Sequence, residues 1–179
     1  MNASQWSLVL GAVLLLKGLF ALGATAAAVR RAQSFARDVW IGRVLATVAW
    51  IWAGWALYTM PLEFLAPLRH WIPLAILVCI PLTWWWMADL LACRAVGGLL
   101  VLFPCPLLLA VRFHPSAWRL VLVAFAYAAV VTGMALILYP YFLRRWLDWL
   151  AVKPGRLRAA GAASLALGAL FLALGLAVL

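Results

Sequence analysis

The stretch RRAQSFARDVWIGR, residues 30–43, places four basic residues between two long apolar segments. Ten of the 14 Lys and Arg residues lie in that stretch, at Arg94 and in the segment 144–158. The chain between these positions is almost continuously apolar, and 70% of its 179 residues are hydrophobic. Basic residues confined to alternate connections are typical of the cytoplasmic loops of a multi-span membrane protein. We therefore expect an all-α fold, a polytopic transmembrane helical bundle.

The composition argues against a soluble domain and against a nucleic-acid partner. Only 10% of the residues are charged, too few to cover the surface of a soluble domain of this length. The net charge of +10 is concentrated beside apolar segments, where anionic lipid headgroups are the nearest partner. We therefore expect the lipid bilayer, and no nucleic acid, to be the main partner. Cys79, Cys93 and Cys105 lack metal-ligand spacing and are expected to be small buried residues.

A helix that crosses a bilayer needs about 20 mostly apolar residues. The candidate spans are 6–28, 43–59, 71–88, 94–111, 119–139 and 159–179. We expect a single transmembrane domain over residues 1–179, with these six spans arranged as three helical hairpins. The third span contains Pro73 and Pro81 and is followed by a very short connection. Five spans, with the segment 71–88 re-entrant or interfacial and shielded by its neighbours, is the alternative.

The basic residues also predict the orientation of the spans. The connections after the first, third and fifth spans hold ten Lys and Arg residues, and the other two connections hold three. This excess predicts that the odd-numbered connections are cytoplasmic and that both termini lie outside. Tryptophan clusters near span ends, such as Trp84, Trp85 and Trp86, are typical of side chains that anchor at headgroup depth.

The last third of the chain carries a family resemblance. From Gly133 the sequence reads GMALILYP, followed by RRWLDWL and then GRLRAAGAASLALGALFLALG. In this order of motifs, residues 120–179 resemble the small two-helix inner-membrane proteins of the YjeT type. The resemblance implies a helical hairpin in a bacterial inner membrane, and it implies no chemistry. This chain departs from that pattern in its four additional spans and its Trp-rich linker.

Lys17 is the one ionisable side chain in the middle of a predicted span. Exposure of a lysine to lipid at the centre of a span costs about 2.5–3.5 kcal/mol. The four carboxylates of the chain are all predicted to lie near or beyond a membrane surface; they are Asp38, Glu63, Asp89 and Asp148. The simplest interpretation is a lysine that extends its amine to the interface. The functional alternatives are an ion pair with an acidic residue of another subunit and a site that handles protons or anions.

Small residues recur every seven positions in both terminal spans. Gly11 and Gly18 lie in the first span, and Gly161, Gly168 and Gly175 lie in the last. This period keeps the glycines on one helix face, where two backbones can approach closely. The pattern predicts close helix contacts at both faces, either within the chain or with a partner.

Two further sets of residues are expected at the inner surface. Arg43, Arg94 and Arg158 open the even-numbered spans and are expected to pair with lipid phosphates and to set the topology. The segment 141–153 is amphipathic, because Phe142, Trp146, Trp149 and Leu150 recur at helical spacing. Such a segment is suited to lying in the membrane interface, and docking of a cytoplasmic partner is the alternative.

No catalytic constellation is present in the sequence, so we expect a protein that is not an enzyme and has no cofactor. His70, His114 and Glu63 have no ligand spacing, and we expect interfacial polar residues there and no metal site. The leading hypothesis is a non-catalytic scaffold, accessory subunit or assembly partner that binds other membrane subunits or forms a homo-oligomer. The alternative is a small-solute or ion transporter or channel-like protein that uses Lys17.

Overall fold

The computed structural model describes residues 2–23, 34, 38–59, 69–87, 90–152 and 154–177. These residues form helices and short connections without a strand, so the all-α fold class is confirmed. The helices are α1 (Ala3–Gly23), α3 (Val39–Thr59), α4 (Ile72–Trp86), α5 (Leu91–Leu102), α6 (Pro104–Val111), α7 (Arg119–Leu138), α8 (Tyr141–Val152) and α9 (Pro154–Ala177).

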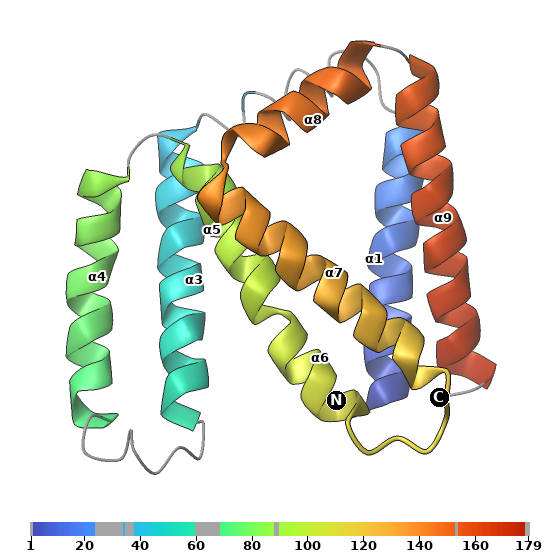
Figure 1. Cartoon of the computed structure of the whole chain (residues 1–179), viewed down its shortest axis with the longest axis horizontal. Coiled ribbons are helices and arrows are strands. Elements are labelled where there is room, and N and C mark those ends of the chain that lie inside the picture. The colour runs from blue at the N-terminus through green and yellow to red at the C-terminus, as the bar shows by residue number, and fades with distance from the viewer. Residues whose placement is uncertain are drawn as a thin grey trace.

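Within the described residues, five helices are long and apolar enough to cross a membrane. They are α1, α3, the stretch Leu91–Val111 that comprises α5 and α6, α7, and α9 from Gly155. The segment expected as the third span, 71–88, forms α4, which has 15 residues and is therefore about 22 Å long. This length is below the hydrocarbon thickness of about 30 Å. α4 nevertheless packs along α3, and it ends at the same end of the molecule as the start of α5 (Figure 1).

Two local features shorten or bend the helices in the middle of the chain. After α4, Leu90 adopts the left-handed conformation with φ 57°, and the chain reverses there into α5. Between α5 and α6, Pro104 and Pro106 each lack the N–H that would continue the helical hydrogen bonds, and the helix is interrupted at Phe103.

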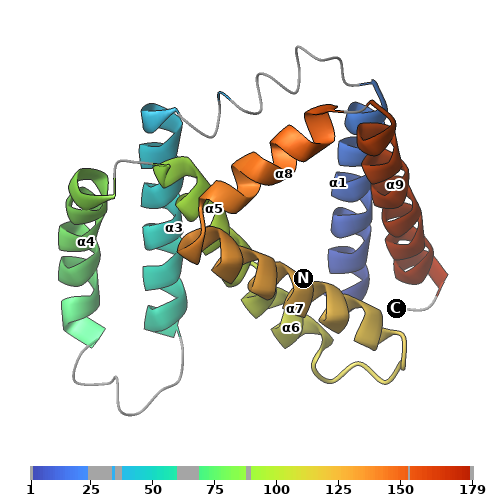
Figure 2. The same cartoon turned by 45° about the horizontal axis from the view of Figure 1, so that its top comes forward.

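α1 and α7 run in one direction, and α3, the α5–α6 stretch and α9 run in the opposite direction (Figures 1 and 2). The short helix α4 runs antiparallel to α3. The start of α1, the end of α9 and the connection from α6 to α7 lie at one end of the molecule. The opposite end holds α8 and the starts of α3 and α5, and we call it the basic end because Arg43, Arg94, Arg144, Arg145 and Arg158 lie there. The expected first span extends to residue 28, and its last five residues, together with Arg30, Arg31 and Arg37, lie outside the described residues.

The helices do not pack as the three expected hairpins of consecutive spans. Instead α1 packs along α9, α3 packs between α4 and α5, and α5 packs against α7. The α1–α9 pair meets α6 and α7 only near the end opposite to the basic end, in a core that contains Leu10, Leu107, Leu122 and Phe171. From this core the α1–α9 pair and α7 diverge, and α8 lies across the basic end between them (Figures 1 and 2).

Candidate functional site

The two glycine faces expected in the terminal spans pack against each other. A Cβ added at Gly18 would lie 2.9 Å from the carbonyl oxygen of Gly161, and one added at Gly168 would lie 3.0 Å from that of Gly11. Gly175 approaches the side chain of Leu8 and the backbone of α1 in the same way. The small residues therefore allow an internal contact between α1 and α9, and they are not left open for a partner.

A buried hydrogen bond adds to this helix pair. The Ser7 hydroxyl donates to the carbonyl oxygen of Phe171 across a distance of 2.7 Å, and the Ser7 side chain is fully buried. Hydrogen bonds between helices in an apolar environment contribute about 0.6 kcal/mol on average. This bond fixes the register of α1 on α9 at the level of the core.

A second glycine contact, which the sequence analysis did not single out, joins α5 to α7. A Cβ at Gly97 would lie 2.7 Å from the carbonyl oxygen of Gly133, and a Cβ at Gly133 would lie 2.6 Å from that of Gly97. Gly42 makes a similar approach to the backbone nitrogen of Ala92, which joins α3 to α5. These glycines have no seven-residue repeat in the sequence, so only the crossing of the helices identifies their role.

Lys17 is exposed on α1. Ala3, Leu10 and Lys17 are spaced by seven residues and share one helix face, and the first two are buried in the core that joins α1 to α6 and α7. Lys17 lies six residues before Gly23, where α1 ends at the basic end. This spacing corresponds to about 9 Å along the helix. Because the helices diverge above the core, the same face is covered at Leu10 and uncovered at Lys17 (Figure 1).

The three arginines expected at the inner surface all lie at the basic end, in different surroundings. The Arg43 guanidinium carbon lies 5.7 Å from the ring centres of both Trp40 and Trp84. The Arg94 side chain is half-buried at the start of α5, and Arg158 is exposed near the start of α9. Arg43 and Arg94 therefore form part of the packed group of α3, α4 and α5, whereas Arg158 does not.

The amphipathic segment expected at 141–153 forms α8 over residues 141–152. Leu150 is buried, and Phe142, Trp146 and Trp149 are exposed. Arg156 of α9 donates to the carbonyl oxygen of Trp149 at 3.1 Å, and its guanidinium carbon lies 4.4 Å from the Trp149 ring centre. The helix therefore presents large aromatic side chains outward at the basic end, as an interfacial helix does.

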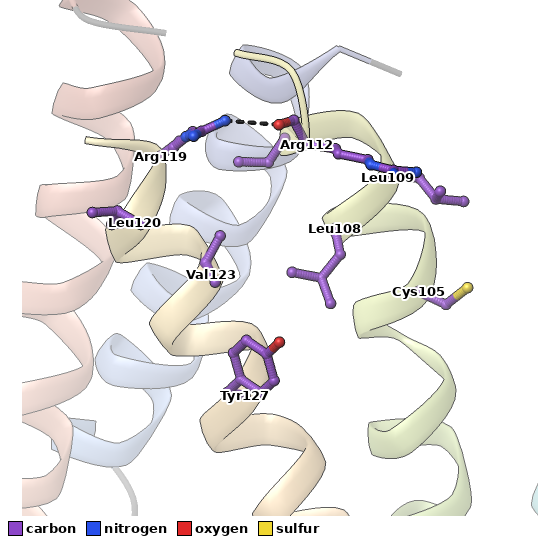
Figure 3. Close-up of a pocket in the computed structure, with 9 residues that line it drawn as sticks. Cys105, Leu108, Leu109, Arg112, Arg119, Leu120, Val123 and Tyr127 are labelled. Atoms are coloured by element: carbon purple, nitrogen blue, oxygen red, sulfur yellow. Dashed lines mark hydrogen bonds between the residues drawn. The ribbon is translucent and has the colours of Figure 1, made fainter. Parts of the chain in front are cut away.

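An apolar cavity of about 450 Å³ lies between α6 and α7, at the opposite end of the molecule (Figure 3). Its walls include Leu108, Val123 and Tyr127. At its mouth the Arg119 guanidinium donates to the carbonyl oxygen of Arg112 across 2.7 Å, which satisfies a backbone group at the C-terminus of α6. The cavity lining contains no carboxylate, and we assign this arginine pair a structural role.

The described residues contain no group of three or more His, Cys, Asp or Glu side chains that could hold a metal ion. The His70 and Trp71 rings are tilted against each other by 47° with their centres 5.2 Å apart, and His114 accepts a hydrogen bond from the backbone of Ser116. Glu63, the carboxylate considered with them, lies outside the described residues.

Comparisons with protein-family models, curated proteins and solved structures find no match to this chain.

Proposed function

We propose that this chain is a non-catalytic accessory subunit or scaffold of a membrane complex, and that it binds another membrane protein through the face of α1 that carries Lys17. The observation that carries this proposal is an exposed lysine on a helix that is otherwise apolar over a span's length. In this proposal the protein is a multi-pass protein of a bacterial inner membrane, with the basic end in the cytoplasm and both termini outside.

Charge indicates the kind of partner. The described carboxylates both lie at the basic end: Asp38 directly precedes α3, and Asp148 lies in α8. Asp38 accepts hydrogen bonds from the backbone of Trp40 and Ile41, and Asp148 lies 4.0 Å from Arg144. A second copy of the chain would bring the same lysine and, among its described acids, the same two carboxylates far from Lys17. A different membrane protein with an Asp or Glu inside one of its spans provides the complementary charge.

The experiment is purification of the full chain from its native membranes in a mild detergent, as wild type, as Lys17→Met and as Leu19→Met. Leu19 is exposed on the same helix and serves as the control for a change in an exposed α1 side chain. We expect a defined membrane protein to co-purify with the wild type and the control and to be lost with Lys17→Met. Exchange of the charges, Lys17→Glu together with an acid-to-lysine change in the partner, should restore the complex.

Two results would argue against the proposal. Retention of the same partners by Lys17→Met would remove Lys17 from the interface and leave it as a lysine that extends to the membrane surface. Movement of an ion or solute into liposomes by the purified protein alone, lost with Lys17→Met, would favour the transporter alternative instead.

A further inference from the structure

A second apolar cavity, of about 330 Å³, lies between α3, α4 and α5 near the basic end. Small residues create it: Ala46, Ala49 and Ala53 follow one face of α3, and Gly98 faces them from α5. Its volume is within the range of about 300–1,000 Å³ that is usual for small-molecule sites. The lining is almost entirely apolar, and its one charged residue is Arg94.

Three nitrogen donors around this cavity are buried and have no hydrogen-bond acceptor among the described residues. They are Arg43 Nε, Trp84 Nε1 and Arg94 Nε. Trp84 packs against the cluster of Ala46, Leu91 and Ala95, all three of which also line the cavity, and the Arg43 guanidinium lies against the Trp84 ring. A buried donor without an acceptor is destabilising, and more so when it belongs to a charged group. Arg94 therefore places one positive charge in the cavity wall, and the Trp84 indole and the Arg43 guanidinium lie in the packed group beside that wall.

No described carboxylate neutralises these two arginines. Asp148 pairs with Arg144 on α8. Asp38 is the other described acid, and its Oδ1 accepts the backbone N–H groups of Trp40 and Ile41. Among the described residues, therefore, no carboxylate offsets the positive charge of this site, which lies at the end of the molecule where the proposed topology places lipid headgroups.

We propose that this site binds an anionic phospholipid, with the phosphate group at Arg43, Trp84 and Arg94 and an acyl chain in the apolar cavity. Guanidinium groups bind phosphate oxygens through paired hydrogen bonds, and the indole N–H adds one more donor. The alanine face of α3 and Gly98 of α5 leave room for the acyl chain between the two helices. This inference does not depend on the proposed accessory function, because it concerns other helices and another ligand.

Native mass spectrometry of the full chain in a neutral detergent tests the proposal. The protein is titrated with phosphatidylglycerol, with phosphatidylcholine of the same acyl chains, and with inorganic phosphate alone. We expect one phosphatidylglycerol to bind in preference to phosphatidylcholine, and inorganic phosphate to compete poorly. Arg43→Gln combined with Arg94→Gln should weaken binding by at least about tenfold, since two charged donors are lost.

Matched variants separate this site from general attraction of anionic lipid to the basic end. Arg145→Gln combined with Arg158→Gln removes the same charge from exposed positions at the same end and should leave binding unchanged. Ala49→Leu fills the cavity, keeps both arginines and should also displace the lipid, so the test does not rest on the arginine variant alone. Equal losses in the two double variants, equal binding of both lipids, unchanged binding with Ala49→Leu, or strong competition by inorganic phosphate would each overturn the proposal.

Discussion

The crossing of α5 and α7 provides the sharpest quantitative test of this fold. In Gly97→Ala the new methyl carbon lies 2.7 Å from the Gly133 carbonyl oxygen, whereas ordinary contact begins at 3.4 Å. The obstacle is backbone, so the two helices must separate by about 0.7 Å, and overpacking of this kind costs about 1–3 kcal/mol. The alanine also gains about 1 kcal/mol of helix propensity over glycine, which partly offsets that cost.

Gly98→Ala is the matched control because it lies on the same helix and has the same gain in propensity. Its new methyl carbon would meet only the Ala49 Cβ at 3.8 Å, an ordinary contact. The difference in unfolding free energy between the two variants therefore measures the cost of the close contact with α7. We expect Gly97→Ala to be less stable than Gly98→Ala by about 1–3 kcal/mol.

The free energies of unfolding are obtained by titration with SDS in mixed micelles, followed by far-ultraviolet circular dichroism. Gly133→Ala should behave like Gly97→Ala, because each methyl group meets the other residue's carbonyl oxygen. The double variant should be destabilised by less than the sum, since one separation of the helices accommodates both methyl groups. Equal or greater stability of Gly97→Ala relative to Gly98→Ala would refute the close backbone contact between α5 and α7.

Three further predictions concern the helix pair, the topology and the core. Ser7→Ala removes the buried hydrogen bond to α9 and should lower the free energy of unfolding by about 0.6–1.5 kcal/mol. Ser164→Ala loses only a hydrogen bond within its own helix and should lower this free energy less. Equal losses in the two variants would contradict a stabilising hydrogen bond between α1 and α9. Cysteines introduced at Arg145 and at Ala117 lie at opposite ends of the molecule, so an impermeant maleimide should label them from opposite sides of the membrane. Labelling of both cysteines from one side would exclude a topology in which the two ends of the molecule face opposite compartments. Cys93 is 0% exposed, whereas Cys79 and Cys105 are half-buried. In single-cysteine variants Cys93 should therefore react most slowly of the three with a permeant maleimide. A faster reaction of Cys93 than of Cys79 or Cys105 would contradict its burial.

Local sequence features were sufficient to predict the fold class and most of the helices. Long apolar segments leave the backbone no partner other than itself, so they form helices whatever their neighbours are. The amphipathic spacing from Phe142 to Leu150 likewise predicted α8. The segment 71–88 contains two prolines and is followed by a short connection, which weaken the pattern of a spanning helix, and its α-helix α4 has 15 residues.

The sequence by itself determined that this chain is a set of apolar helices with positive charge between alternate pairs of them, since hydropathy and charge act over a few residues at a time. The seven-residue glycine pattern marked two helix faces for close packing, but it did not say which helices would meet. Only the tertiary structure decided that α1 pairs with α9 and that Gly97 meets Gly133. It also decided that Arg94 lines a cavity and that Trp84 packs against residues of its wall, with Arg43 beside the Trp84 ring. Those contacts depend on how whole surfaces fit together, and apolar side chains of similar size carry little information about the partner that each will face.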